Sequence, residues 1–97
     1  MSHFYDVEYT DTFAGEANYS WVRRAVISVP DLAHYGYTGG ADGSYSRANK
    51  AQRREVMRRA KAEMGLTGVR GEVEDYGYSL AFRPRGMCTV LFATFRD

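Results

Sequence analysis

Five basic side chains recur at helical spacing in the middle of the chain and form its most distinctive chemical pattern. Each stands three or four positions after the one before it; the five are Arg47, Lys50, Arg54, Arg58 and Lys61. Steps of three and four hold one angular position on an α-helix, so these cations are expected to form one stripe. Like charges in a row repel one another, which favours a stripe that contacts phosphates or an acidic protein surface; the alternative is a solvated face.

Acidic residues are scarce around this basic stripe. Residues 46–64 hold seven basic residues and two acidic ones, Glu55 and Glu63, and helical spacing is expected to place both carboxylates outside the stripe. Residues 1–45 show the opposite balance, with two basic and six acidic residues. The formal net charge of +1 therefore hides a dipolar chain with a local positive excess.

The segment ahead of the stripe, residues 31–45, is rich in glycine and tyrosine. Its glycine spacing fits neither of the nucleotide-binding fingerprints, so it predicts a long flexible loop and not a phosphate-binding loop. Connections of this length inside a small domain are often functional. Tyr35 and Tyr37 are therefore candidate partner-binding residues, because tyrosine gives a large contact area at low entropic cost.

Groups able to carry out covalent or acid–base chemistry are sparse. The histidines are His3 and His34, and the single cysteine, Cys88, is expected to be inert packing in the most apolar strand. No metal-ligand spacing and no nucleophile–base pattern is present, so we expect no catalytic residue, no metal site and no cofactor. One enzymatic alternative stays open, a small RNA-cleaving toxin that works on a phosphate with Arg23, Arg24, His34 and Tyr35.

The stripe requires a helix, and the sequence predicts one over residues 46–64. Ser46 or Ser44 can cap its first turn, and Gly65 stands where a left-handed residue ends a helix. Its apolar side is thin and also carries Arg53; the other members are Val56, Met57, Ala60 and Met64. A helix with so narrow an apolar side is expected to lie on a sheet.

Five strands are predicted to supply that sheet, over residues 3–10, 19–29, 69–75, 78–83 and 87–95. The last is the most apolar and is expected to be central. Residues 12–18 are expected to form a loop, and Pro84 to stand second in a type I turn that begins at Arg83. The order β-β-α-β-β-β over residues 1–97 predicts one α+β domain, an antiparallel sheet of four to five strands with one helix packed across it.

Composition restricts where such a protein works. One cysteine allows no internal disulfide, which is typical of a reducing compartment. No apolar run approaches the roughly 20 residues of a membrane span, and residues 1–6 lack the pattern of a signal peptide. We therefore expect a cytoplasmic protein with no membrane partner.

Two stretches resemble a group of short uncharacterised proteins of bacteriophages and mobile elements. They are residues 9–24, YTDTFAGEANYSWVRR, and residues 82–92, FRPRGMCTVLF. No activity and no site residue can be carried over from that group. The resemblance implies a bacterial host cell as the setting, where small phage proteins without catalytic residues often bind host machinery, anti-CRISPR proteins among them.

The leading hypothesis is a non-enzymatic phage or mobile-element binding protein that inhibits a host defence complex, in the manner of an anti-CRISPR protein. Its partner would be a host protein or ribonucleoprotein complex, held by the basic stripe together with Tyr35 and Tyr37. The main alternative is direct nucleic-acid binding, with the same helix on phosphates and Tyr or Trp rings stacked on bases. The sequence carries no signal for an oligomeric state.

Overall fold

The computed structural model describes residues 2–30 and 44–96, with side chains placed for residues 3–30 and 50–96. Its elements follow in the order β1 (Ser2–Phe13), β2 (Glu16–Pro30), α2 (Ser44–Glu63), β3 (Gly71–Asp75), β4 (Ser79–Pro84) and β5 (Thr89–Phe95). The predicted α+β class and the order β-β-α-β-β-β are confirmed.

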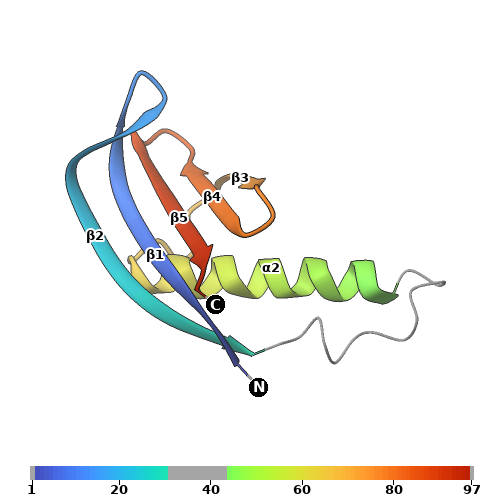
Figure 1. Cartoon of the computed structure of the whole chain (residues 1–97). Helices are drawn as coiled ribbons and strands as arrows, with labels where there is room; N and C mark the ends of the chain where they lie inside the picture. The colour runs from blue at the N-terminus through green and yellow to red at the C-terminus, as the bar shows by residue number, and fades with distance from the viewer. Residues whose placement is uncertain (1, 31–43, 97) are drawn as a thin grey trace.

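The five strands form one antiparallel sheet in the order β2-β1-β5-β4-β3. The middle strand is β5, as its apolar sequence predicted, and Val90 and Leu91 are completely buried on its two faces. Helix α2 crosses one face of the sheet and packs against β2, β5 and β4 (Figure 1). The N-terminal half of α2 extends beyond the strands, whereas its C-terminal half lies over them (Figure 1).

The core lies between the sheet and the apolar side of α2. Alternate strand residues face the helix, because side chains along a strand point to opposite faces. The main members are Val7, Tyr9, Ile27, Val29, Leu80, Phe82, Leu91 and Ala93 from the strands and Val56, Met57, Ala60 and Met64 from the helix. Each large aliphatic or aromatic side chain buried there contributes roughly 1.5–3 kcal/mol.

The helix ends as the sequence predicted. Gly65 adopts a φ of 74°, and Leu66 donates its N–H to the carbonyl of Lys61 at 2.7 Å while Gly65 donates to Ala62 at 3.2 Å. These two bonds are those of a Schellman motif, which satisfies carbonyls that the last turn would leave unpaired. Leu66 is consequently folded back into the core.

The prediction of a loop over residues 12–18 is wrong. Strands β1 and β2 continue to a two-residue turn at Ala14 and Gly15, whose φ values are 54° and 84°, and Phe13 pairs with Glu16. A type I′ turn requires positive φ at both central residues, and it matches the twist of a hairpin. Alanine is rare at such a position, so the turn chemistry was not visible in the sequence.

A bulge of several residues interrupts the same hairpin near its tip. The pairing shifts between Thr10, opposite Val22, and Thr12, opposite Ala17, so residues 18–21 of β2 face a single residue of β1, Asp11. That carboxylate accepts hydrogen bonds from the Ser20 side chain and backbone and from Asn18 Nδ2, which hold the pKa of Asp11 well below its ordinary value. The Thr10 hydroxyl accepts from the Tyr19 N–H and donates to the Trp21 carbonyl, so Asp11 and Thr10 together supply partners that the missing ladder would have supplied.

The predicted type I turn after β4 is displaced by one residue. Strand β4 includes Pro84, and the turn runs from Pro84 to Met87, whose N–H donates to the Pro84 carbonyl at 3.4 Å. Gly86, with a φ of 77°, then takes the third position, where a type II turn needs glycine. Cys88 follows the turn and is exposed, so the prediction that it packs inside the last strand is wrong.

Candidate functional site

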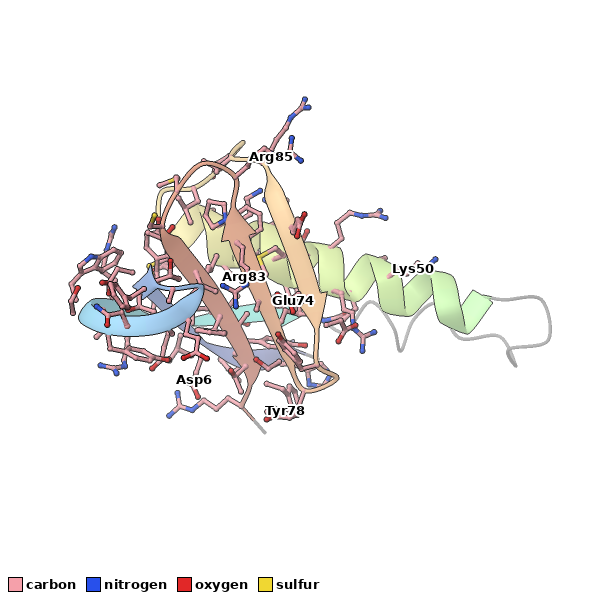
Figure 2. All side chains as sticks on the ribbon, turned by 90° about the horizontal axis from the view of Figure 1, so that it is seen from above. Asp6, Lys50, Glu74, Tyr78, Arg83 and Arg85 are labelled. Carbon is pink, nitrogen blue, oxygen red and sulfur yellow. The ribbon has the colours of Figure 1, made fainter. Side chains whose placement is uncertain are left out.

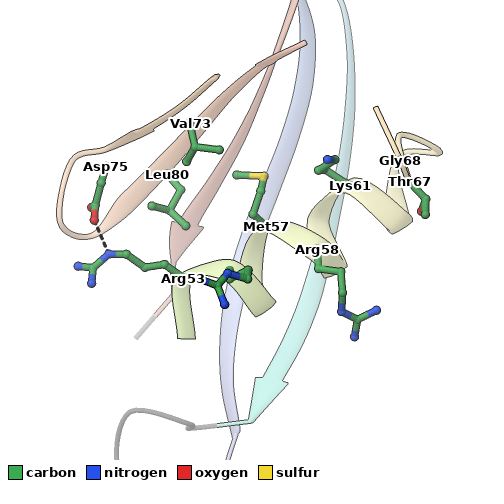
Figure 3. Close-up of a pocket in the computed structure, with 10 residues that line it drawn as sticks. Arg53, Met57, Arg58, Lys61, Thr67, Gly68, Val73, Asp75 and Leu80 are labelled. Carbon is green, nitrogen blue, oxygen red and sulfur yellow. Dashed lines mark ion pairs between the residues drawn. The ribbon is translucent and has the colours of Figure 1, made fainter. Parts of the chain in front are cut away.

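A groove of about 410 Å³ lies between α2 and the β3–β4 side of the sheet (Figure 3). Its floor is apolar and consists of Met57, Val73 and Leu80. The helix packs against β4 but leaves β3 uncovered, so Val73 remains 52% exposed. The other lining residues are mainly cationic or small: Arg53, Arg54, Arg58, Lys61, Thr67, Gly68 and Asp75.

The structure brings three of the predicted stripe residues, Arg54, Arg58 and Lys61, together on the wall of this groove. Lys50 lies farther along α2, on the part of the helix that projects past the strands (Figure 2). Arg47 lies on the same helix, but its side chain is outside the described residues, as are Tyr35 and Tyr37. Along the part of the stripe whose side chains are described, Lys50, Arg54 and Arg58 are exposed and Lys61 is half-buried.

Lys61 is engaged within the fold. Its Nζ donates to the Val69 carbonyl at 2.6 Å and lies 4.6 Å from the centre of the Phe82 ring. The first contact fixes the chain that leads from the helix into β3, and the second is a cation–π interaction. A side chain held in this way contributes positive potential to the groove but does not reach outward to a partner.

Arg58 is also paired, because Glu55 lies beside the stripe, outside it as expected, and within reach of Arg58. Arg58 donates from Nε and Nη2 to the two oxygens of Glu55 at 2.8 and 2.6 Å, and Arg59 donates from Nε at 2.6 Å. Hydrogen bonds from Arg58 and then Arg59 lower the pKa of Glu55 from 4.5 to about 2. Spacings of three and four residues on a helix allow both pairs.

Arg53 and Asp75 form an ion pair that joins α2 to β3 at one end of the groove (Figure 3). The sequence carried a signal for this contact, because Arg53 lies on the apolar side of the helix, where a cation needs a partner. What the sequence could not show was which carboxylate would meet it. The pair limits the groove on the side nearest the helix N-terminus.

Two stripe cations keep their charge available. Lys50 and Arg54 are exposed and make no ion pair with any residue that the structure describes. The groove therefore combines an apolar floor with one unpaired guanidinium, that of Arg54, and two cations paired with carboxylates, Arg53 and Arg58. Such a site can take an apolar side chain and an adjacent carboxylate.

The residues considered for phosphate cleavage are not assembled into a site within the described part of the chain. Arg24 donates from Nε to Glu8 at 2.9 Å on β2, Arg23 is exposed on the same strand, and His34 and Tyr35 lie outside the described residues. Across residues 3–30 and 50–96, no group of three or more His, Cys, Asp or Glu side chains is arranged to hold a metal ion.

Comparison with protein-family models, with curated proteins and with solved structures gave no match for this chain. The resemblance to phage and mobile-element proteins therefore rests on the two sequence stretches alone. Among the described residues, α2 is too polar to cross a membrane, and no other helix is long and apolar enough to do so.

Proposed function

We propose that this chain is a non-enzymatic binding protein that docks on an acidic and partly apolar surface of another protein through the groove between α2 and β3. The observation that carries the proposal is the apolar floor of Met57, Val73 and Leu80 directly beside the guanidinium of Arg54. Apolar side chains of a protein partner would fill such a floor, with a carboxylate placed against the cation.

The use of charge inside the chain favours a protein partner over a nucleic acid. Binding to a duplex typically neutralises about six to ten phosphates with basic side chains. Along the described part of the stripe, Arg58 bonds to Glu55 and Lys61 to the Val69 carbonyl, which leaves Lys50 and Arg54. Two unpaired cations, of which Arg54 lies beside the apolar floor, suit a local acidic patch better than a phosphate track.

The setting implied by the resemblance adds a class of partner to this proposal. In a bacterial host the partner would be a component of a defence complex, a CRISPR–Cas ribonucleoprotein being one such target. Docking by the basic helix would then block a surface that the complex needs for its own assembly or substrate. Direct binding to nucleic acid is the competing outcome of the experiment.

The test is capture of partners from a lysate of the host bacterium, treated with nuclease, by the immobilised chain and two charge-reversal variants. Arg54→Glu changes the groove, and Arg23→Glu makes the same charge change on β2, where Arg23 is exposed and makes no ion pair with a described residue. We expect one stoichiometric protein partner that wild type and Arg23→Glu retain and Arg54→Glu loses.

Two results would overturn the proposal. One is a partner that disappears after nuclease digestion, together with a salt-sensitive shift of random oligonucleotides by the purified chain, which would establish nucleic-acid binding. The other is equal capture by wild type and Arg54→Glu, which would remove the groove from the interface.

A further inference from the structure

Strand β3 ends the sheet on the groove side and has an unpaired backbone edge. Two backbone hydrogen bonds show which residues of β3 bond to β4: the Arg85 N–H donates to the Arg70 carbonyl and the Tyr76 N–H to the Ser79 carbonyl, both at 2.9 Å. In an antiparallel ladder such pairs alternate, so the even residues of β3 bond to β4. The N–H and C=O groups of Gly71, Val73 and Asp75 therefore point outward from the sheet.

The opposite edge of the sheet is treated differently. On β2 the backbone of Ser28 points outward, and Arg59 Nη1 donates to its carbonyl oxygen at 2.8 Å. The same strand ends at Pro30, which has no N–H to offer a further strand. The cap on β2 covers one outward carbonyl near the end of that strand, whereas no side chain caps the outward groups of β3 among the residues that the structure describes, so β3 is open for pairing beside the groove.

The side chains of β3 indicate which kind of strand would pair with it. Glu72 and Glu74 lie on the face away from α2, whereas Val73 lies on the groove side with Leu80 and Met57. Antiparallel pairing with a second copy around Val73 would set Glu72, which makes no ion pair with a described residue, against Glu74 twice. Like charges directly opposed destabilise a strand pair, and the bond from Arg83 offsets only part of the charge of Glu74. A strand with basic residues on that face and an apolar residue between them has no such conflict.

We infer that β3 accepts an extended segment of the partner protein as a sixth, antiparallel strand, with alternating side chains sorted by the two faces of the sheet. Basic side chains of the segment face Glu72 and Glu74. An apolar side chain opposite Val73 enters the groove, with a carboxylate beside it toward the basic wall. This inference rests on the proposed function, because it names the shape and chemistry of the partner that the groove binds.

A synthetic peptide supplies a direct probe. Its central residues are Thr, Lys, Leu, Lys and Glu, flanked by Ser, so that Leu stands opposite Val73 and the two Lys oppose Glu74 and Glu72. The Leu N–H faces β3 in this register, and the N–H of either Lys faces solvent. Methylation of the Leu nitrogen should weaken binding at least about tenfold through loss of backbone bonds, and methylation of a Lys nitrogen by less than about twofold.

Amide hydrogen exchange reads the same register from the protein side. On peptide binding, the amides of Gly71, Val73 and Asp75 should gain protection, while those of Glu72 and Glu74, already bonded to β4, should change little. Equal affinity of the two methylated peptides would overturn the inference. So would a uniform exchange pattern along β3, or no binding at about millimolar peptide.

A backbone variant separates this inference from the proposed function. Val73→Pro removes an outward N–H that β4 does not use, at an edge position where proline is tolerated, and Val73→Thr is the matched control that keeps the N–H. We expect Val73→Pro to weaken capture of the host partner much more than Val73→Thr does, because both variants change the side chain on the groove floor and only proline also removes the N–H. Capture kept by Val73→Pro but lost by Arg54→Glu would overturn strand addition and leave groove docking intact; capture kept by both would overturn both.

Discussion

Arg83 of β4 donates from Nη1 to the carbonyl oxygen of Gly15 at 2.9 Å, which joins the turn end of the last hairpin to the turn of the first. Its Nε donates to Glu74 at 3.0 Å, so one guanidinium connects β4, β3 and the β1–β2 turn on the face of the sheet away from α2 (Figure 2). The long first hairpin is therefore held at its tip as well as along its ladder.

Arg83→Met should release this tip while keeping the apolar stem of the side chain. We expect a loss of about 1 kcal/mol in the free energy of unfolding, the usual net contribution of such a hydrogen bond. Amides around Ala14 and Gly15 should also exchange faster. Arg85→Met is the control, because Arg85 projects from the turn and makes no ion pair within the described residues (Figure 2). Equal effects of the two variants would contradict the anchoring role.

Lys61→Met tests the assignment of Lys61 to the fold and not to the partner. Methionine keeps a long apolar side chain beside Phe82 but loses both the bond to the Val69 carbonyl and the cation–π contact. The free energy of unfolding should fall by about 1–2 kcal/mol, measured by urea denaturation. Partner capture at saturating protein should persist, in contrast to Arg54→Glu. Unchanged stability combined with lost capture would reverse the assignment.

Glu55→Gln should reduce stability in a way that depends on pH. The folded pKa of Glu55 is lowered to about 2 from 4.5, so its ionised form stabilises the fold above about pH 4.5. That contribution is lost as pH falls toward 2, where the carboxylate becomes protonated in the folded state as well. The difference between wild type and variant should therefore be about 0.5–1 kcal/mol near neutral pH and should disappear in acid. A difference that stays constant from neutral pH to the acid limit would show that ionisation of Glu55 is not its source.

Gly71→Ala should damage the β3 edge. A Cβ built on Gly71 would lie 2.1 Å from the Arg83 carbonyl oxygen and 2.9 Å from Cε1 of Phe82, so the strand must move. Overpacking of this kind typically costs about 1–3 kcal/mol. Gly68→Ala is the comparison, since a Cβ there meets nothing within 4 Å and only the φ of 82° opposes it. Thermal unfolding should rank Gly71→Ala as the more destabilising; the reverse order would contradict the close approach.

Local sequence patterns predicted the strands that build the sheet and the helix that packs on it. The apolar run at Val90 to Phe95 marked the central strand, and Gly65 marked the end of α2 through a conformation that other residues adopt at a cost. Both signals are local. They depend on a handful of consecutive residues, so they could be read without knowing the tertiary contacts.

Most of the features that were missed depend on side-chain contacts between elements. The tight turn at Ala14 is held partly by Arg83, and the bulge opposite Asp11 is held by Ser20 and Asn18. The groove likewise arises because α2 packs against β2, β5 and β4 and leaves β3 uncovered. This follows from the order of strands in the sheet, which the pattern of a single strand does not encode. The pairing of Arg58 with Glu55, by contrast, is allowed by their spacing of three residues along the helix.

Pro84 has a consequence for both ladders that β4 forms. Without an N–H, Pro84 cannot donate to Thr89, so the β4–β5 ladder ends at the pair Phe82 and Leu91. Pro84 also stands opposite Gly71 of β3, in a pair that forms no backbone hydrogen bonds. The nitrogen of Pro84 faces β5 and not β3, so proline limits the length of the β4–β5 ladder and leaves the β3–β4 ladder intact. A single imino acid thus ends one ladder without interrupting its neighbour, and the turn that leads into β5 can begin at Pro84 itself.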